Sequence, residues 1–290
     1  MTKKHRNWGW VFVTPYIVGL LLFFLIPVIF SIYVSFTKYN LFNPPEFVGL
    51  RNYIELFSDK EIWYACRNTL VLALVYMPLQ MIIACVIAVL LNQKIRAMSV
   101  FRSIYFLPVL TPMVAVCVVW SFMYNPDFGI LNYVLSFFHL GPYSYIYSTS
   151  WFEFIVSIGM MSIWKGVGQT TVYLLAGLTG IDTEVLESAE IDGAGSVQRF
   201  FKITLPLLSP TIFFLLIIGM IGVFQTFDSI YTMQVSSGAN TEVLGTLIYK
   251  YAFDKSKLGL ASAVGWVTFA LVAVFTFVQK QYEKRWVHYE

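Results

Sequence analysis

The sequence predicts an all-α integral membrane protein that crosses the bilayer six times, with both termini in the cytoplasm. The first observation is composition: hydrophobic residues make up 58% of the 290 residues and charged residues only 12%, whereas roughly 25% of an ordinary soluble chain is charged. The second is that uncharged stretches of about 20 residues or more, the length that spans a bilayer, recur along the chain. The third is that these stretches lack the polar and apolar alternation of transmembrane β-strands. The composition also excludes a disordered chain and a basic nucleic-acid-binding module.

The six helices are predicted where charged residues are absent. Five fall in stretches without any charge, and the fourth is interrupted only by Lys165. The predicted helices cover residues 10–36, 68–92, 103–125, 154–178, 206–227 and 258–279. Together they are expected to form a single transmembrane domain, residues 1–290.

A further uncharged stretch, Phe128–Phe152, is predicted not to cross the membrane. Its apolar part, Ile130–Leu140, ends at Gly141-Pro142 and is too short to span the hydrocarbon. The residues that follow are rich in tyrosine and hydroxyl side chains, which favour the membrane–water interface. We expect a helix that lies near the membrane surface.

The orientation is predicted from the lysine and arginine residues near the helix ends. More of them fall in the segments that an inside N-terminus places in the cytoplasm, including Lys3, Lys4 and Arg6 before the first helix and Lys94 and Arg96 after the second. The first helix is too long for a signal peptide and lacks a cleavage site close behind it. It is therefore expected to remain in the mature protein.

Several chemistries are missing from the predicted spans. The three histidines lie in the two tails and in the surface segment, and the three cysteines are scattered. We therefore expect no catalytic site, no metal site and no cofactor in this chain. The sequence also contains no phosphate-binding Gly-x-x-x-x-Gly-Lys-Ser/Thr loop, so the chain is not expected to bind ATP in that manner.

The segment between the fourth and fifth helices, residues 182–205, is acidic although it should face the cytoplasm. Thr183–Asp192 reads as a helix with acids in its first turn, Gly193 supplies a bend, and Ser196–Ile203 reads as a second short helix. Val185 and Ala189 share one helix face, with Phe200 and Phe201 packing beneath. The pattern fits either a compact knob projecting from the membrane or a solvated amphipathic loop.

Residues Glu187–Ala194 (Glu-Ser-Ala-Glu-Ile-Asp-Gly-Ala), followed by Phe200–Pro206 (Phe-Phe-Lys-Ile-Thr-Leu-Pro), resemble the EAA loop of permease subunits in binding-protein-dependent ABC importers. Ser188 stands where that family usually has alanine. Five further elements resemble the carbohydrate-uptake members, including maltodextrin and glycerol-phosphate permeases: Phe47–Tyr53, Arg102–Pro108, Ile163–Gly166, Phe227–Tyr231 and Leu258–Ala263. The resemblance covers nearly the whole chain. It departs at Val235–Ala239, where many relatives carry a Thr-Gly-Gly-Pro turn.

The resemblance implies one half of a transport pore in the bacterial cytoplasmic membrane. The implied partners are a second permease, two ATPase subunits that bind ATP and magnesium, and an extracytoplasmic solute-binding protein. No enzymatic activity is implied for the chain itself. The residues that match the ATPase-coupling part of the loop are Val185, Leu186, Glu187, Ala189, Asp192 and Gly193. Val185, Leu186 and Ala189 would fill a groove of the ATPase, and Glu187 would pair with a basic group there.

The solute that the resemblance implies is a sugar, most simply an oligosaccharide. Glycerol phosphate or another polyol-like solute is an alternative and would call for more basic residues along the path. An autonomous secondary carrier is a third possibility. It would predict internal symmetry and acids within the spans, and the sequence has neither.

The solute path is predicted from polar and aromatic residues in or near the spans. Helix four concentrates them, because its candidates are three and four residues apart and share one stripe. The candidates are Tyr124 and Asn125 in helix three, Ser162, Lys165, Gly166 and Gln169 in helix four, and Gln225, Thr226 and Asp228 offered by helix five. The resemblance places Ser162, Gly166 and Gln169 in a solute pocket.

Two interpretations of this stripe remain open. It could line the path, or it could pack helices together through small and hydrogen-bonding residues. Lys165 could snorkel towards water, pair with an acid of the partner permease, or bind an anionic group of the solute.

Overall fold

A computed structural model describes residues 3–92 and 98–286 of the chain. Lys94 and Arg96, used above for orientation, lie outside these residues. The chain divides into two compact units, one made of residues 1–63 and 247–269 and the other of residues 64–246 and 270–290.

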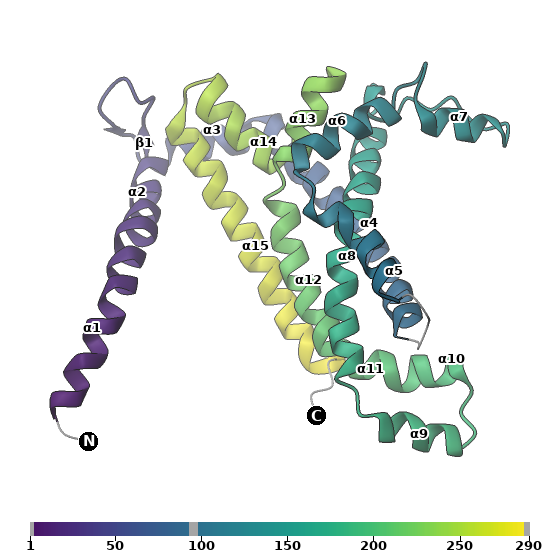
Figure 1. The fold of residues 1–290 in the computed structure, drawn as a ribbon. Coiled ribbons are helices and arrows are strands. Elements are labelled where there is room, and N and C mark those ends of the chain that lie inside the picture. The colour runs from purple at the N-terminus through teal and green to yellow at the C-terminus, as the bar shows by residue number, and fades with distance from the viewer. Residues whose placement is uncertain (1–2, 93–97, 287–290) are drawn as a thin grey trace. The chain divides into compact units, whose positions relative to one another are not determined.

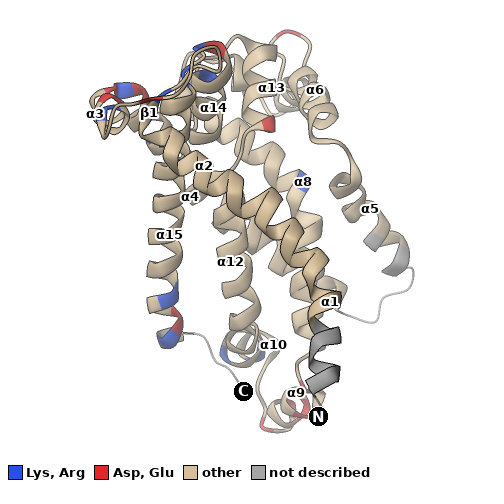
Figure 2. Cartoon of the chain, turned by 90° about the vertical axis from the view of Figure 1, so that its left-hand side faces the viewer, with Lys and Arg blue, Asp and Glu red and all other residues tan. Residues whose placement is uncertain are grey.

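Within the described residues, three helices are long and apolar enough to cross a membrane by themselves: Trp10–Ser35, Lys60–Leu91 and Leu258–Lys284. The number of candidate spans rises to five if each of two bent helix pairs is counted as one span. Figure 2 shows that long stretches of α12 (Ser209–Phe224) and α15 (Leu258–Trp286) carry no charged side chain. The structure is therefore mostly helical and membrane-spanning, as the composition predicts.

The smaller unit contains the first span and the segments around its exit. The span runs without interruption through α1, a π-helical turn η1 and α2, and the chain then forms a two-stranded antiparallel ribbon. Its elements are α1 (Lys3–Leu20), η1 (Leu21–Leu25), α2 (Ile26–Ser35), β1 (Thr37–Lys38), β2 (Glu46–Phe47), α3 (Arg51–Ser58), the start of α4 (Lys60–Leu91), the end of α14 (Leu244–Tyr249), η4 (Lys250–Asp254) and the first part of α15.

The Phe47–Tyr53 element closes the end of the first span. The Asn52 amide donates hydrogen bonds to the carbonyls of Ser35 and Thr37, at 2.8 and 2.9 Å, and the Tyr53 hydroxyl donates to Ser35 Oγ at 2.8 Å. These carbonyls lie where a helix runs out of intrahelical partners. A side chain on Gly259 would collide with the Thr37 carbonyl, so glycine lets α15 start against the same turn. The element thus has a structural role at the exit of helix one.

Charged residues connect α3 and the start of α4 to η4 and the residues that follow it. Glu61 pairs with Lys250 and Lys255, each at 3.3 Å, and Glu55 pairs with Lys257 at 3.0 Å. The Tyr251 hydroxyl donates to Asp59 Oδ2 at 2.9 Å. This network holds two segments together that are far apart in the sequence.

Acidification is expected to weaken this network at Asp59. Partial burial acts to raise the Asp59 pKa, but hydrogen bonds from the Glu61 amide and the Tyr251 hydroxyl, with the charges of Lys255 and Lys250, leave it below its ordinary value. Because the folded-state pKa is lowered, the stabilisation is complete above the unfolded pKa of about 3.9 and is lost as pH falls through the lower folded value. Thermal unfolding of wild type and Asp59→Asn between pH 7 and pH 3 measures this. The wild type should lose its advantage at acidic pH, and parallel curves for the two proteins would contradict the assignment.

The larger unit packs its helices around two clusters of buried hydrophobic residues. One buried cluster, around Tyr124, Phe154, Ile158 and Met233, lies towards one end of α8, and another, around Ala88, Leu174 and Leu208, lies towards the other. The further elements are α5 (Met98–Leu110), α6 (Met113–Met123), α7 (Ile130–Ser136), η2 (Tyr145–Tyr147), α8 (Trp151–Thr179), α9 (Thr183–Ile191), α10 (Ser196–Arg199), η3 (Phe200–Thr204), α11 (Leu205–Leu207), α12, α13 (Asp228–Ser237) and the last part of α15. In Figure 1, α9 and α10 lie at one end of this unit and α6, α7 and α13 at the other.

Two predicted helices are not single straight helices, and this corrects the sequence analysis. Residues 103–125 are broken at Thr111-Pro112 into α5 and α6, which meet at 106°. The fifth helix begins at Ser209 after a 61° bend, with Pro210 in its first turn, and ends at Phe224 rather than at residue 227. Proline explains both breaks, since it lacks the N–H that the preceding turn needs and restricts the residue before it.

The other predicted helices are present with different ends. The second starts at Lys60, eight residues before the predicted position, and the sixth runs to Trp286. Both extensions carry charged residues, which a count of uncharged residues leaves out. The fourth, α8, covers Trp151–Thr179, and the segment expected at the membrane surface contains α7.

Candidate functional site

The acidic loop folds as two short helices. Asp182 caps α9 by accepting a hydrogen bond from the Glu184 amide at 3.0 Å. At the other end Gly193 adopts a φ of +81°, and the amides of Gly193 and Ala194 bond back to the carbonyls of Glu190 and Ala189, both at 3.0 Å. This is a Schellman ending, in which glycine avoids the cost that a side chain would meet at positive φ. Glycine is therefore the residue that lets the chain turn from α9 into α10.

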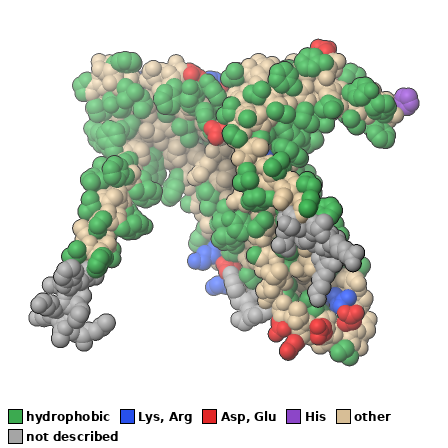
Figure 3. Space-filling view, in the orientation of Figure 1, with side chains coloured by type: hydrophobic (Ala, Val, Ile, Leu, Met, Phe, Trp, Pro, Cys, Tyr) green, Lys and Arg blue, Asp and Glu red, His purple; other side chains and the backbone are tan. Residues whose placement is uncertain are grey.

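The knob, which we define as α9 and α10 with residues 182–199, presents acids and apolar side chains outward. Figure 3 shows the acidic side chains gathered at this end. Glu190 pairs with Arg199 across the two helices. Glu187 and Asp192 are exposed, as are Val185 (42%), Ile191 (86%) and Val197 (72%). The sequence analysis did not select Ile191 or Val197.

Two of the residues predicted to contact a partner face the chain itself. Ala189 is 8% exposed, and Leu186 is half-buried against the cluster around Leu174 and Leu208. Val185 and Ala189, four residues apart in α9, lie on one face of the helix, but only Val185 is exposed there. Of the two phenylalanines expected beneath, Phe200 is half-buried and Phe201 is 60% exposed.

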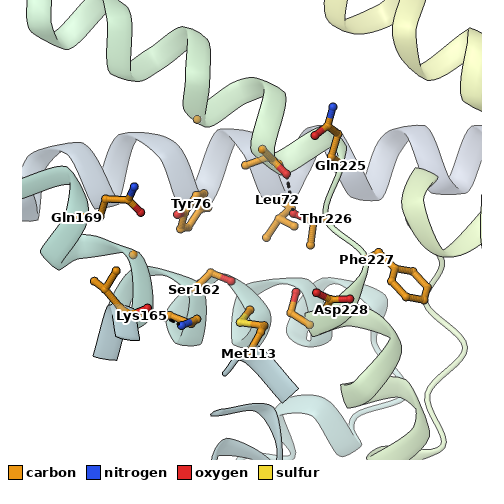
Figure 4. A pocket seen from close by; sticks show the side chains of 16 residues that line it. Leu72, Tyr76, Met113, Ser162, Lys165, Gln169, Gln225, Thr226, Phe227 and Asp228 are labelled. Carbon is orange, nitrogen blue, oxygen red and sulfur yellow. Dashed lines mark hydrogen bonds between the residues drawn. The ribbon is translucent and has the colours of Figure 1, made fainter. Parts of the chain in front are cut away.

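A cavity of about 420 Å³ lies among α4, the α5–α6 break, α8 and the end of α12. Seven of the nine predicted path residues line it: Ser162, Lys165, Gly166, Gln169, Gln225, Thr226 and Asp228. Figure 4 shows Leu72 and Tyr76 of α4 facing Ser162 and Met113 across the cavity, while Gln225 points away. Residues from four separate parts of the larger unit thus meet at one place.

The two remaining path residues do not line this cavity. Tyr124 is fully buried, and its hydroxyl donates to the Ser157 carbonyl at 2.6 Å. Asn125 turns the chain after α6, because its side-chain oxygen accepts from the amides of Asp127 and Phe128, at 2.9 and 3.2 Å. Both residues have structural roles at the end of α6.

Lys165 makes hydrogen bonds to backbone carbonyls within this chain, an arrangement that was not among the three roles considered from the sequence. Its ammonium donates to the carbonyls of Thr111 at 2.7 Å and Pro108 at 3.1 Å, with Val109 at a longer 3.5 Å. These carbonyls belong to the end of α5. A cation at a helix C-terminus is favourable both as a donor and by charge.

The stripe on α8 divides between packing and cavity lining. A side chain on Gly166 would come within 2.9 Å of both Gln80 Nε2 and the Tyr76 hydroxyl, so glycine allows α4 to approach closely. Gln80 in turn donates to Thr170 Oγ1 at 2.7 Å. Gln169 is exposed and lines the cavity. Gly166 therefore packs against α4 and Gln169 lines the cavity, and the assignment of this cavity to the solute path stays a prediction.

The far wall of the cavity is the link from α12 to α13. Thr226 donates to the Gly222 carbonyl at 3.1 Å, and Asp228 is the exposed first residue of α13. Ser229 is 1% exposed, and its hydroxyl has no hydrogen-bond partner among the described residues. Buried hydroxyls nearly always have a hydrogen-bond partner, so the Ser229 hydroxyl, whose oxygen is buried in this wall, is an exception among the described residues.

Sequence reasoning missed Tyr76 and Ser229. Tyr76 sits in an apolar helix with no flanking motif, so nothing in the pattern marked it. Ser229 does follow Asp228 within the Phe227–Tyr231 element, which was a usable signal. Among the described residues no group of three or more histidine, cysteine, aspartate or glutamate side chains could hold a metal ion.

Comparison with known proteins gives consistent matches over this whole structure. The sequence pattern of the family described as "Binding-protein-dependent transport system inner membrane component" matches residues 65–288. The chain is 36% identical to the probable ABC transporter permease protein YesP of Bacillus subtilis, over 99% of this chain and 94% of that protein. It is 32% identical to the trehalose/maltose transport system permease protein MalF of Thermococcus litoralis, over 95% and 93%.

Two further matches extend the comparison. The sn-glycerol-3-phosphate transport system permease protein UgpA of Yersinia pestis is 29% identical, over 97% of this chain and 95% of that protein. Among solved structures, a chain of a bacterial alginate ABC transporter, in complex with its alginate pentasaccharide-bound periplasmic protein, superimposes with a TM-score of 0.79. That match covers 97% of this chain and 96% of the other at 22% identity, and it supports the fold alone.

Proposed function

The chain belongs to the family of binding-protein-dependent transport system inner membrane components, and from this premise we propose that it is the transmembrane subunit of an ATP-driven importer of a neutral oligosaccharide. The main support for a sugar as the solute is the cavity, whose lining supplies hydroxyl, amide and aromatic groups. A sugar needs such hydrogen-bonding groups beside an aromatic face. Relatives named for trehalose and maltose, lactose and multiple sugars support the same class.

In this proposal the chain spans the membrane six times, with both termini inside. The span that is not among the three long apolar helices and two bent pairs is the fourth in chain order, α8, whose 29 residues are long enough but carry Ser162, Lys165 and Gln169 in the middle. A span that lines a polar path need not be apolar all round. The bent pairs α5–α6 and α11–α12 each count as one span, and α7 lies along the membrane surface.

The proposed complex contains a second permease, two ATPase subunits and an extracytoplasmic solute-binding protein. ATP and magnesium would be bound by the ATPase subunits, which dock on the knob. Its exposed Glu187 and Asp192 suit a basic partner surface, and Val185, Ile191 and Val197 supply apolar contact area. Exposed apolar side chains that lie next to charged ones are typical of a protein interaction site.

Within the path, Tyr76 offers the aromatic face and Ser162, Gln169, Thr226, Asp228 and Ser229 offer hydrogen bonds. Lys165 and Asp228 are the charged residues of this lining, and the donors of Lys165 are occupied by carbonyls. An anionic solute would therefore meet a carboxylate and no free cation. This favours a neutral sugar over glycerol phosphate.

The test is uptake by the complex, purified with its native partners and reconstituted in proteoliposomes. Radiolabelled trehalose, maltotriose, lactose and glycerol 3-phosphate serve as probes, each added with ATP inside the vesicles. ATP-dependent uptake of a neutral sugar is expected. Uptake of glycerol 3-phosphate alone would overturn the proposal of a neutral sugar as solute. Uptake without ATP would indicate an autonomous secondary carrier instead of an ATP-driven importer.

Removing the hydroxyl of Ser229 is expected to weaken solute interaction in the permease. Ser229→Ala deletes a buried hydroxyl that has no hydrogen-bond partner among the described residues, so folding should be nearly unaffected while the half-saturating concentration rises. One lost neutral hydrogen bond is worth about 0.5–1.5 kcal/mol, or roughly 2- to 10-fold. The measurement is the concentration dependence of uptake, with Ser236→Ala on the exposed face of α13 as the matched control. Equal values for both variants would remove Ser229 from the path.

A further inference from the structure

The middle of α8 is joined to the break in the bent α5–α6 span by one side chain. Lys165 donates to the carbonyls of Thr111 and Pro108 at 2.7 and 3.1 Å. Thr111 adds a hydrogen bond from its own hydroxyl to the Pro108 carbonyl at 2.6 Å. With the Thr111 amide, which donates to the Pro108 carbonyl at 3.2 Å, three donor groups therefore converge on the end of α5, and we call them the α5 cap.

These donors at the end of α5 are needed because of Pro112. In a continuous helix the Pro108 carbonyl would accept from the amide of residue 112, but proline has no N–H. The next carbonyl, of Val109, loses its partner because α6 turns away by 106°. Unpaired carbonyls are costly where no water reaches them. The Pro108 carbonyl accepts from the Thr111 amide at 3.2 Å and the Thr111 hydroxyl at 2.6 Å as well as from Lys165, so the Thr111 carbonyl, at 2.7 Å from the Lys165 ammonium, is the one that relies most on this side chain.

Close packing accompanies the cap. One turn beyond Lys165, a side chain on Gly168 would lie 2.5 Å from the Tyr105 carbonyl and 3.3 Å from the Phe106 backbone. Residues three apart share a helix face, so Lys165 and Gly168 both face α5. The backbones of α5 and α8 meet directly along this face.

The same helix leads to the knob. α8 ends at Thr179, residues 180–182 turn the chain, and Asp182 caps α9. At its middle, α8 lines the cavity together with Val109 and Met113, which flank the break. A displacement of α9 would therefore reach the cavity through α8 and, at Lys165, pass to the α5–α6 wall.

We propose that Lys165 is a positioning residue that makes the α5–α6 break move with α8, so that movement of the knob reshapes the cavity. It acts through the carbonyls of α5 and does not bind solute. This inference rests on the proposed function, because it concerns how ATP hydrolysis at the knob reaches the path.

The test compares Lys165→Met, which keeps the length but removes the donors, with Lys165→Arg, which keeps donors and charge. Each is measured in reconstituted complexes for ATP hydrolysis and for uptake of maltotriose, or of whichever neutral probe the wild type imports. Lys165→Met should keep ATP hydrolysis within about twofold while uptake per ATP falls about tenfold, a coupling loss within the usual range. Lys165→Arg should retain most of the coupling. Gln169→Leu is the matched control, because it lines the same cavity and should change the half-saturating concentration without changing uptake per ATP.

A second variant removes the reason for the cap. Pro112→Ala removes the ring that interrupts the helix, so that the carbonyls of Pro108 and Thr111 could accept from the amides four residues further on, as in a continuous helix. It should therefore partly suppress Lys165→Met, either in uptake per ATP or in recovery of assembled complex if the single variant fails to assemble. Absence of suppression would overturn the proposal, as would unchanged uptake per ATP in Lys165→Met. A rise in half-saturating concentration alone would instead make Lys165 a solute ligand. Failure of the wild type to import any neutral sugar would count against the proposed function and not against the cap.

Discussion

Complexes that carry Glu187→Arg together with Gly193→Pro are expected to lose their ATPase subunits during affinity purification in mild detergent. Gly193 has a φ of +81°, whereas proline fixes φ near −65°, so the Schellman ending of α9 cannot form. Glu187→Arg reverses an exposed charge on the same helix. Changes at the centre of an interface commonly cost about 2 kcal/mol or more, so recovery of the ATPase should fall at least about tenfold.

Mass spectrometry of the purified sample measures this recovery, with the second permease as the internal reference. Asp127→Arg is the matched control, since it reverses an exposed acid in the turn after α6, at the other end of the larger unit. The control should retain the ATPase. An ATPase held equally well by both variants would mean that the knob is not the docking element.

The second large effect is expected at the contact between α5 and α8. Gly168→Ala places a methyl group 2.5 Å from the Tyr105 carbonyl, a backbone atom that cannot move aside without moving α5. Overpacking of this kind costs typically about 1–3 kcal/mol. We expect a lower unfolding temperature and poor assembly with the second permease.

The control for this substitution is Gly265→Ala in α15. A side chain at Gly265 would meet nothing within 4 Å, so the same chemical change should be neutral or slightly stabilising because alanine favours helix. Fluorescence-detected unfolding of the two purified variants gives the comparison. Similar unfolding temperatures would show that α5 and α8 do not pack as closely as described.

The sequence is sufficient to predict where the chain is helical, because the absence of charge over about 20 residues is a strong signal. It does not reveal where a helix breaks. Pro108 lies inside α5 without ending it, whereas Pro112 coincides with a 106° break. The carbonyls at this break accept from Thr111 nearby and from Lys165, more than 50 residues further along the chain, and local spacing does not reveal such a distant partner.

Placement of the site was predictable along α8 and less so elsewhere. Helical spacing brought Ser162, Lys165, Gly166 and Gln169 to one stripe, and all four line the cavity. Tyr124 had suitable chemistry but is used by the core. Composition cannot tell a tyrosine that faces a cavity, such as Tyr76, from one whose hydroxyl is bonded to a buried carbonyl, because that depends on packing between helices.

The central position of Lys165 in α8 has a consequence for how the protein is made. A lysine at the middle of a span raises the free energy of membrane insertion by about 2.5–3.5 kcal/mol, so α8 is a weak candidate for entering the bilayer unaided as it leaves the insertion machinery. The carbonyls that offset this cost come from α5, which is synthesised first. Biogenesis should therefore be ordered: α8 would be held at the insertion site until it meets α5, and a chain with α5 deleted would leave α8 outside the lipid.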